Sequence, residues 1–300
     1  MTIAVQRPQG ALDRAAPWLF LLLWSSSFLG TRVGLRHMPP LLFVAVRMVL
    51  AAVILLAVMI LRRRPWGLSP AAWLHCAIAG VLVQAILLMT AHSAMVRTEA
   101  APIALIQTLN PLCSALLAWP LLGERLRPSQ ILGLGLGFAG VLLVLGRAAI
   151  AARAELPGLL ATVAGVGCLV AGTLYYRHFC RAVPPAAGAT VQTIAAAVVC
   201  AGSAYLLEPP WTDFNPALYA AIGWNAIVVT IGGMGLYFLM LAHGTAARAT
   251  VNFYLVPGLT SLLTWAFLGE RLSKLTFVGL GISFAGCWLV GRSAGRARSE

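Results

Sequence analysis

Ten long apolar runs, separated by short segments rich in Arg, Pro and Gly, constrain this chain more than any other feature. A helix needs about 20 residues, each rising about 1.5 Å, to cross the hydrocarbon core of a bilayer. The runs are long and rich in Leu and Ala, and they lack the alternation of a membrane β-barrel. They predict an all-α membrane protein. The expected helix cores are Ala15–Thr31, Leu41–Leu61, Ala72–Met95, Ala101–Leu122, Ile131–Leu145, Leu156–Tyr176, Ala186–Leu207, Ala217–His243, Ala249–Leu268 and Thr276–Val290.

The composition excludes an ordinary soluble domain. Of the 300 residues, 60% are hydrophobic and only 10% are charged, whereas soluble domains have about 25% charged residues. The net charge of +13 would suit a nucleic-acid partner, but the basic residues lie between the apolar runs and form no continuous stripe. Basic loops are expected where a membrane protein faces the cytoplasm and anionic lipid headgroups.

The distribution of basic residues predicts the orientation in a bacterial inner membrane. With the N-terminus inside, thirteen basic loop residues face the cytoplasm and seven face outward. Cytoplasmic loops carry the excess of Lys and Arg, so both termini are expected inside. The first apolar run follows Arg7 and Arg14, like a signal peptide, but nine further runs favour an uncleaved first helix.

An internal repeat divides the chain into two halves. Residues 109–144 and 255–290 align without a gap, and 18 of the 36 positions are identical. This duplication predicts one five-helix unit over residues 1–153 and a second over 154–300. Because five is odd, the second unit must enter the membrane in the opposite orientation. Inverted repeats are typical of secondary transporters, whose halves exchange conformations across the membrane plane.

Several motifs occur in both halves. They are Pro111 and Pro257, the LLGERL and FLGERL turns, and the GLGLGFAG and GLGISFAG helices. With Arg47 in FVAVRMVLAA, they resemble EamA-type members of the drug/metabolite transporter superfamily over essentially the whole chain. The resemblance implies ten helices around a central cavity and export of amino acids or related metabolites, with aromatic amino-acid exporters as the nearest subgroup. Arg47 has no Arg partner in the second half, so that position is not symmetric.

The repeated Gly-Glu-Arg turns have two interpretations. Glu124 with Arg125, and Glu270 with Arg271, can cap helices after a terminating glycine, or their ion pairs can act as gates that break during transport. The Gly135–Gly140 segment matches a dinucleotide-binding pattern, but it lies in an apolar run with no preceding strand. Small residues spaced for close helix contact explain it better.

Polar residues inside the runs are the candidate substrate-binding residues. Arg47 can extend its side chain towards the interface, or it can bind a substrate carboxylate. For the others, the alternative to a cavity is hydrogen bonding between helices. Pro111 and Pro257 favour the cavity, because irregular backbone at membrane depth persists where it lines a cavity or packs on protein. The candidates are Trp24, Arg47, Gln84, His92, Gln107, Asn110, Asn225, Tyr237, Asn252 and Tyr254.

The sequence indicates no enzymatic site. The six cysteines are scattered without metal-ligand spacing, no Walker motif is present, and no Asp or Glu lies deep in a run. We therefore expect no catalytic residue, metal or cofactor. The expected partners are a small-molecule substrate, membrane lipid and, as an open option, a second copy of the chain. Two alternatives remain: a lipid or sugar-conjugate flippase subunit of the same fold, and a membrane-embedded enzyme.

Overall fold

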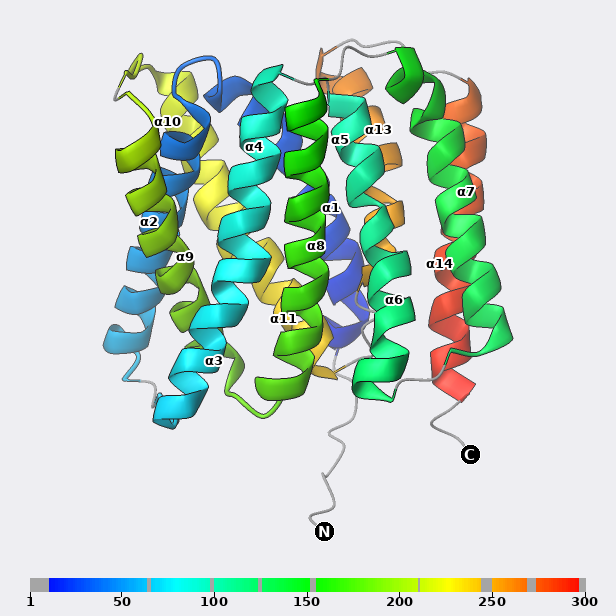
Figure 1. Cartoon of the computed structure of the whole chain (residues 1–300), viewed down its shortest axis with the longest axis horizontal. Helices are drawn as coiled ribbons and strands as arrows, with labels where there is room; N and C mark the ends of the chain where they lie inside the picture. The colour runs from blue at the N-terminus through cyan, green and yellow to red at the C-terminus, as the bar shows by residue number, and fades with distance from the viewer. Residues whose placement is uncertain are drawn as a thin grey trace.

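The computed structural model describes residues 11–63, 66–97, 100–123, 126–151, 155–209, 211–243, 250–268 and 274–296. Within these ranges all regular structure is helical, and the helices form one bundle with their axes mostly along a common direction (Figure 1). The expectation of an all-α membrane protein is confirmed. The start of α1 and the end of α14 lie at the same end of the bundle (Figure 1).

Within the described residues, seven helical segments are long and apolar enough to cross a membrane. They are Pro40–Leu61, Pro70–Val96, Leu105–Leu122, Pro128–Leu145, Leu156–Phe179, Pro185–Leu207 and Pro216–Met240. A shorter apolar helix covers Lys274–Val290. The first expected span does form a helix, α1 (Ala11–Gly34). It is not among the seven, because Arg14 and Arg32 leave only a short uncharged stretch between them and this stretch contains three serines.

The remaining elements follow the order of the expected runs. In the first half they are α2 (Pro40–Leu61), α3 (Pro70–Gly80), η1 (Val81–Ile86), α4 (Leu87–Arg97), α5 (Ala100–Gln107), α6 (Leu109–Leu122) and α7 (Pro128–Ala151). In the second half they are α8 (Leu156–Phe179), α9 (Pro185–Leu207), α10 (Pro216–Gly223), η2 (Trp224–Met234), α11 (Gly235–His243), η3 (Val251–Tyr254), α13 (Val256–Leu268) and α14 (Lys274–Arg296).

Irregular helix occurs at equivalent places in the two halves. The π-helical segment η1 joins α3 to α4, and the longer π-helical segment η2 joins α10 to α11. The next helix of each half is also interrupted, at Thr108 between α5 and α6 and at the 3₁₀ segment η3 before α13. Pro111 and Pro257 stand in the first turns of α6 and α13, where a residue without an N–H group is tolerated. The local sequence thus explains the second pair of interruptions.

Equivalent helices of the two halves pack against each other. The helices α7 and α14 lie side by side (Figure 1). A Cβ on Gly140 or Gly279 would collide with the other residue's carbonyl oxygen, and Gly133 and Gly286 approach each other in the same way. Residue numbers increase along α7 in the direction in which they decrease along α14, so the two helices run antiparallel. Ser283 Oγ donates to the Gly137 carbonyl oxygen at 3.1 Å between the two glycine pairs.

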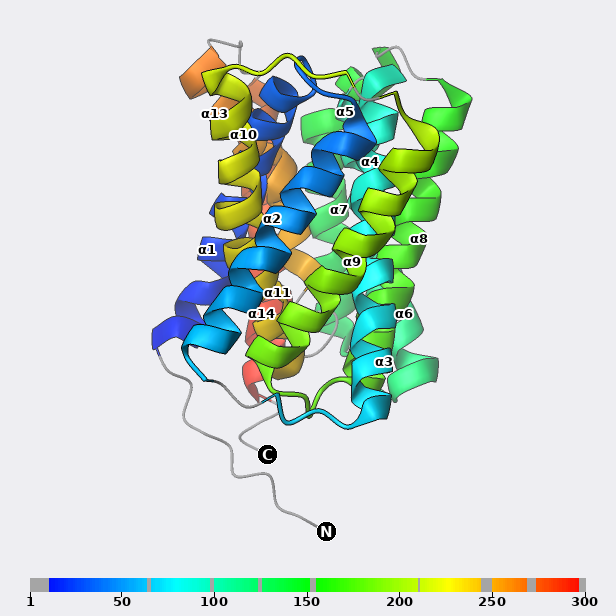
Figure 2. The same cartoon turned by 90° about the vertical axis from the view of Figure 1, so that its left-hand side faces the viewer.

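The helices α2 and α9, which are also equivalent, lie side by side on another face of the bundle (Figure 2). In the interior, α1 packs against η2, α11 and α13. This places α1 beside the irregular segments of the second half, and the polar residues discussed next gather there.

Candidate functional site

Arg47 lies in a buried polar group formed by α2, α4, η2 and α1. Its side chain is 1% exposed, so it does not extend to the interface. Its Nε donates to Thr230 Oγ1 at 3.0 Å, and Thr230 Oγ1 in turn donates to the Asn225 carbonyl oxygen at 2.9 Å. The Nη1 atom of Arg47 has no hydrogen-bond partner among the residues that the structure describes. Burial of such a donor costs its hydration free energy, and no hydrogen bond within the protein offsets this cost.

His92 closes this group on the side of α4. Its Nδ1 lies 2.7 Å from the Leu88 carbonyl oxygen, which can only accept, so Nδ1 carries the proton. Its Nε2 lies 3.3 Å from Thr31 Oγ1. His92 therefore links α4 to α1 with both nitrogens in use.

A second buried contact is the counterpart of the Arg47–Thr230 pair. Adding the repeat offset of 146 to Arg47 gives Thr193 on α9, and subtracting it from Thr230 gives Gln84 on η1. Thr193 Oγ1 donates to Gln84 Oε1 at 3.5 Å. The same two helix positions thus meet in both halves, once with a charged group and once with neutral groups.

An aromatic cluster lies beside these polar contacts. It consists of Phe20 and Trp24 of α1, Tyr237 of α11 and Phe253 of η3, with ring centroids 5.4–5.9 Å apart. All four side chains are buried. The Tyr237 hydroxyl lies 2.8 Å from Thr173 Oγ1, and Asn110 is its second polar neighbour.

The structure therefore brings together two subsets of the predicted substrate-binding residues. Arg47, His92 and Asn225 belong to the polar group, with Gln84 in its counterpart. Trp24, Asn110 and Tyr237 belong to the aromatic cluster or touch it. Four further residues of these groups were not predicted from the sequence. They supply the hydroxyls between helices and are Thr31, Thr173, Thr193 and Thr230. Their position within apolar runs was the available signal, but threonine is too common there to be selective.

The other predicted residues lie apart from these groups. Gln107 is partly buried at the end of α5. Asn252 has only a weak contact, 3.8 Å from its Nδ2 to Met240 Sδ. Tyr254 packs against Gly137 of α7. Glu124, Arg125, Glu270 and Arg271 lie outside the described residues, although Gly123 ends α6 in the left-handed conformation with φ +68, as expected of a terminating glycine. Trp265 of α13 is 54% exposed.

Two cavities lie on the outer surface of the bundle rather than among these groups. One, of about 660 Å³, lies between α6 and α8, and its lining includes Leu117 and Val170. The other, of about 860 Å³, lies between α2 and α9, and its lining includes Val49 and Ala201. Both are lined mainly by apolar side chains, so acyl chains of the bilayer suit them better than a polar substrate.

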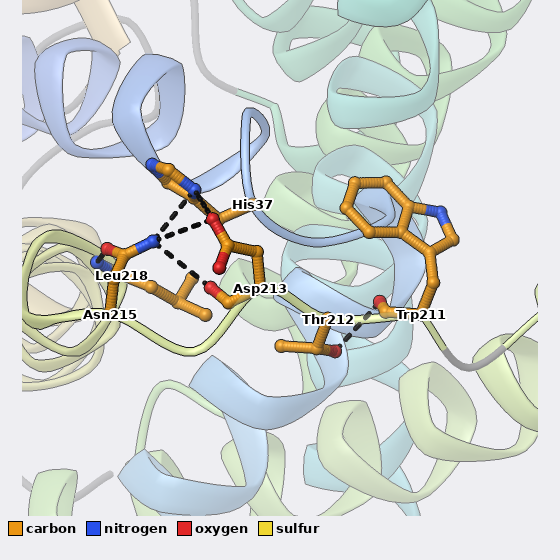
Figure 3. Close-up of polar contacts among 6 residues, drawn as sticks. All are labelled: His37, Trp211, Thr212, Asp213, Asn215 and Leu218. Atoms are coloured by element: carbon orange, nitrogen blue, oxygen red, sulfur yellow. Dashed lines mark hydrogen bonds and ion pairs between the residues drawn. The ribbon is translucent and has the colours of Figure 1, made fainter.

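At one end of the bundle, which we call the polar end, the 35–39 loop meets the 208–215 segment. His37 Nδ1 lies 2.8 Å from Asp213 Oδ2 and 2.8 Å from Asn215 Nδ2 (Figure 3). The Asp213 N–H donates to the His37 carbonyl oxygen at 2.9 Å. The Glu208 carboxylate accepts the N–H groups of Leu41 and Leu42 at 3.0 and 2.8 Å, and thereby stabilises the N-terminus of α2.

At the opposite end, which we call the apolar end, residues 66–69 meet residues 180–184. Trp66 stacks near Trp73 with centroids 5.0 Å apart and packs against the main hydrophobic core with Val183. Cys76 Sγ and Cys180 Sγ lie 3.9 Å apart, and both residues are fully buried. Contact with Cys76 and burial raise the pKa of the Cys180 thiol, so this group stays protonated at neutral pH.

Comparison with known proteins identifies the family. The model of the EamA-like transporter family matches residues 16–146 and again residues 156–292. The chain belongs to the EamA-like transporter family. Among its relatives, the uncharacterised inner membrane transporter YedA of Escherichia coli is 26% identical over 87% of this chain and 84% of its own length. The aromatic amino acid exporter YddG of Ancylobacter novellus is 29% identical over 81% of this chain and 84% of its own.

A solved crystal structure has the same fold. It superimposes with a TM-score of 0.77 at 24% identity, and the match covers 95% of this chain and 98% of that one. Membership in the EamA-like family and the names of its relatives point to a multi-pass membrane transporter rather than an enzyme.

Proposed function

We propose that this EamA-like protein exports amino acids or related small metabolites across a bacterial inner membrane by alternating access. Ten transmembrane helices, arranged as two inverted five-helix repeats around a central substrate site, would carry out this transport. One relative is an aromatic amino acid exporter by name, which supports the substrate class.

The antiparallel contact of α7 and α14 is the observation that carries this proposal. The glycine pairs Gly133–Gly286 and Gly140–Gly279 exchange places under the repeat offset of 146. A pseudo-two-fold axis in the membrane plane relates helices in this way, and it gives the two halves interchangeable conformations. The irregular segments η1, η2 and η3 lie beside the buried polar groups. Such backbone at membrane depth supports a site between the halves.

A transport assay in liposomes tests the function. Purified protein is reconstituted without nucleotide, and counterflow of labelled amino acids is measured. We expect saturable flux of at least one amino acid, because alternating access needs no ATP hydrolysis. Flux equal to that of protein-free liposomes for every amino acid would overturn the proposal.

Thiol labelling tests the proposed orientation, in which both termini and the apolar end face the cytoplasm. In a background with the native cysteines replaced, Phe214→Cys reports the polar end and Arg62→Cys the apolar end, since both positions are exposed. In intact spheroplasts a membrane-impermeant maleimide should label the first variant, and it should label the second only after permeabilisation. The reverse pattern would invert the assignment.

A further inference from the structure

We infer that Arg47 binds the carboxylate of the transported molecule and that Asn225 accepts its ammonium group. This inference rests on the proposed transport function. It names the substrate class as zwitterionic amino acids and assigns a contact to each charged group.

The charge of Arg47 is not neutralised within the described part of the chain. None of the seven apolar spans contains Asp or Glu, and no described carboxylate forms an ion pair with Arg47. Its titratable neighbours are Cys200 and His92, a thiol and an imidazole that add no negative charge in their neutral forms. A buried guanidinium without a counter-charge destabilises a membrane protein. A bound carboxylate would remove this cost and is the natural bidentate partner of Arg.

The repeat shows that a charge at this position is not needed for packing. The equivalent contact, Thr193 with Gln84, joins α9 to η1 with neutral side chains. The Arg47–Thr230 contact joins α2 to η2 at the same positions of the other half. The neutral pair shows that these two helix positions can meet without an ionic group, so packing alone does not account for the guanidinium.

Two unpaired atoms of opposite character lie in this group. Arg47 Nη1 is an unpaired donor and Asn225 Oδ1 is an unpaired acceptor among the described residues. Both residues are almost fully buried. The Asn225 amide is oriented by its Nδ2, which donates to the Ala221 carbonyl oxygen at 3.0 Å, and this leaves Oδ1 free to accept. The hydroxyl of Thr230 contacts both residues, since it accepts from Arg47 Nε and donates to the Asn225 carbonyl oxygen. A carboxylate is a partner for the Arg47 donor and an ammonium group is a partner for the Asn225 acceptor, so a zwitterion admitted when the halves move apart would match both atoms.

The matched variant replaces Arg47 and Thr230 by the residues of the equivalent neutral pair. The double substitution Arg47→Thr with Thr230→Gln recreates the residues of Thr193 and Gln84. Thr193→Val serves as the control at the equivalent contact. The ligands are L-leucine, L-phenylalanine and L-threonine and the three corresponding amides, which lack the carboxylate. Binding is measured in detergent by the rise in melting temperature, and flux is measured in liposomes.

We expect wild type and Thr193→Val to prefer at least one acid over its amide by about tenfold or more, because a charge-assisted contact is lost in the amide. The double variant should fold, bind the acid about tenfold or more weakly, and lose the preference. A single substitution, Asn225→Leu, should weaken the binding of acids and of amides equally, since both keep the ammonium group.

The readouts separate the two proposals. Preference for the acid retained in the double variant, or the absence of acid-dependent binding in wild type, would overturn the Arg47 assignment. Acid-selective binding that depends on Arg47 without flux would support the site and overturn the transport function. Flux with no dependence on Arg47 would support transport and overturn the site.

Discussion

The two ends of the bundle have equivalent backbones but different chemistry. At each end, a segment that follows the second helix of one half meets the loop that follows the first helix of the other. The repeat offset of 146 relates Ser69 to Asn215, and both residues cap the next helix with a side-chain oxygen. At the polar end the segments are joined by a carboxylate, a histidine and amides, whereas at the apolar end they are joined by Trp66, Val183 and two cysteines.

The chemistry of the two ends indicates which of them opens more easily. Hydrogen bonds at the polar end can be exchanged for hydrogen bonds to water at a small net cost. Apolar side chains at the other end gain no such replacement when water enters, because their separation exposes hydrophobic surface. We therefore expect the apolar end to be the tighter closure.

The largest effect should follow a covalent link across the apolar end. Treatment with diamide should join Cys76 and Cys180, as the two thiols release two protons and two electrons to diamide and form one S–S bond. Because the link holds α3 to the segment after α8, we expect flux to fall about tenfold or more. Transport in liposomes and mass spectrometry of the linked peptides measure the result.

The control is Cys180→Ser, whose flux should not respond to diamide, and reduction with dithiothreitol should restore the wild-type rate. If the linked protein transports at the unlinked rate, the apolar end does not open during transport and the contrast between the ends fails.

An intermediate effect is expected at Glu208, which joins the polar end to α2. Glu208→Ala removes two hydrogen bonds to the N-terminal N–H groups of α2 and should cost about 1–2 kcal/mol of stability. The equivalent residue by the repeat offset is Arg62, which is exposed after α2. Arg62→Ala should change stability by about 0.5 kcal/mol or less. Thermal unfolding in detergent compares the two, and equal losses would contradict the assigned role of Glu208.

The smallest effect should come from the contact between His37 and Asp213 at the polar end. The Asp213 side chain is 67% exposed, so Asp213→Asn should cost about 0.5 kcal/mol or less. Raising the salt concentration should reduce the difference between wild type and variant, because exposed charges are screened. A loss of stability that is large and independent of salt would show that the polar end is closed more firmly than its exposure suggests.

Much of the fold could be predicted because the relevant signals are local or repeated. Apolar length predicts membrane helices without knowledge of their partners, and the duplication over residues 109–144 and 255–290 predicts opposite orientations from an odd helix count. The interruptions near Pro111 and Pro257 also have a local cause. The π-helical segments η1 and η2 could not be predicted, since no residue in them forbids an ordinary α-helical turn.

The site was less predictable because it depends on how each helix is rotated. A helix that is apolar on every side gives no hydrophobic face from which to infer its rotation, as the exposed Trp265 illustrates. Arg47 could be identified as an unusual charge at depth, yet its direction was open between the interface and the interior. Thr230, its partner, is 183 residues away, and no spacing rule relates such positions.

Length, apolarity and repetition along the chain are thus enough to predict a duplicated, all-helical membrane protein. The inward direction of Arg47, its contact with Thr230 and the recurrence of that contact as Thr193 with Gln84 become visible only once the helices are packed together. The physical reason is that lipid accepts any apolar helix face, so the rotation of each helix is set by packing against its neighbours.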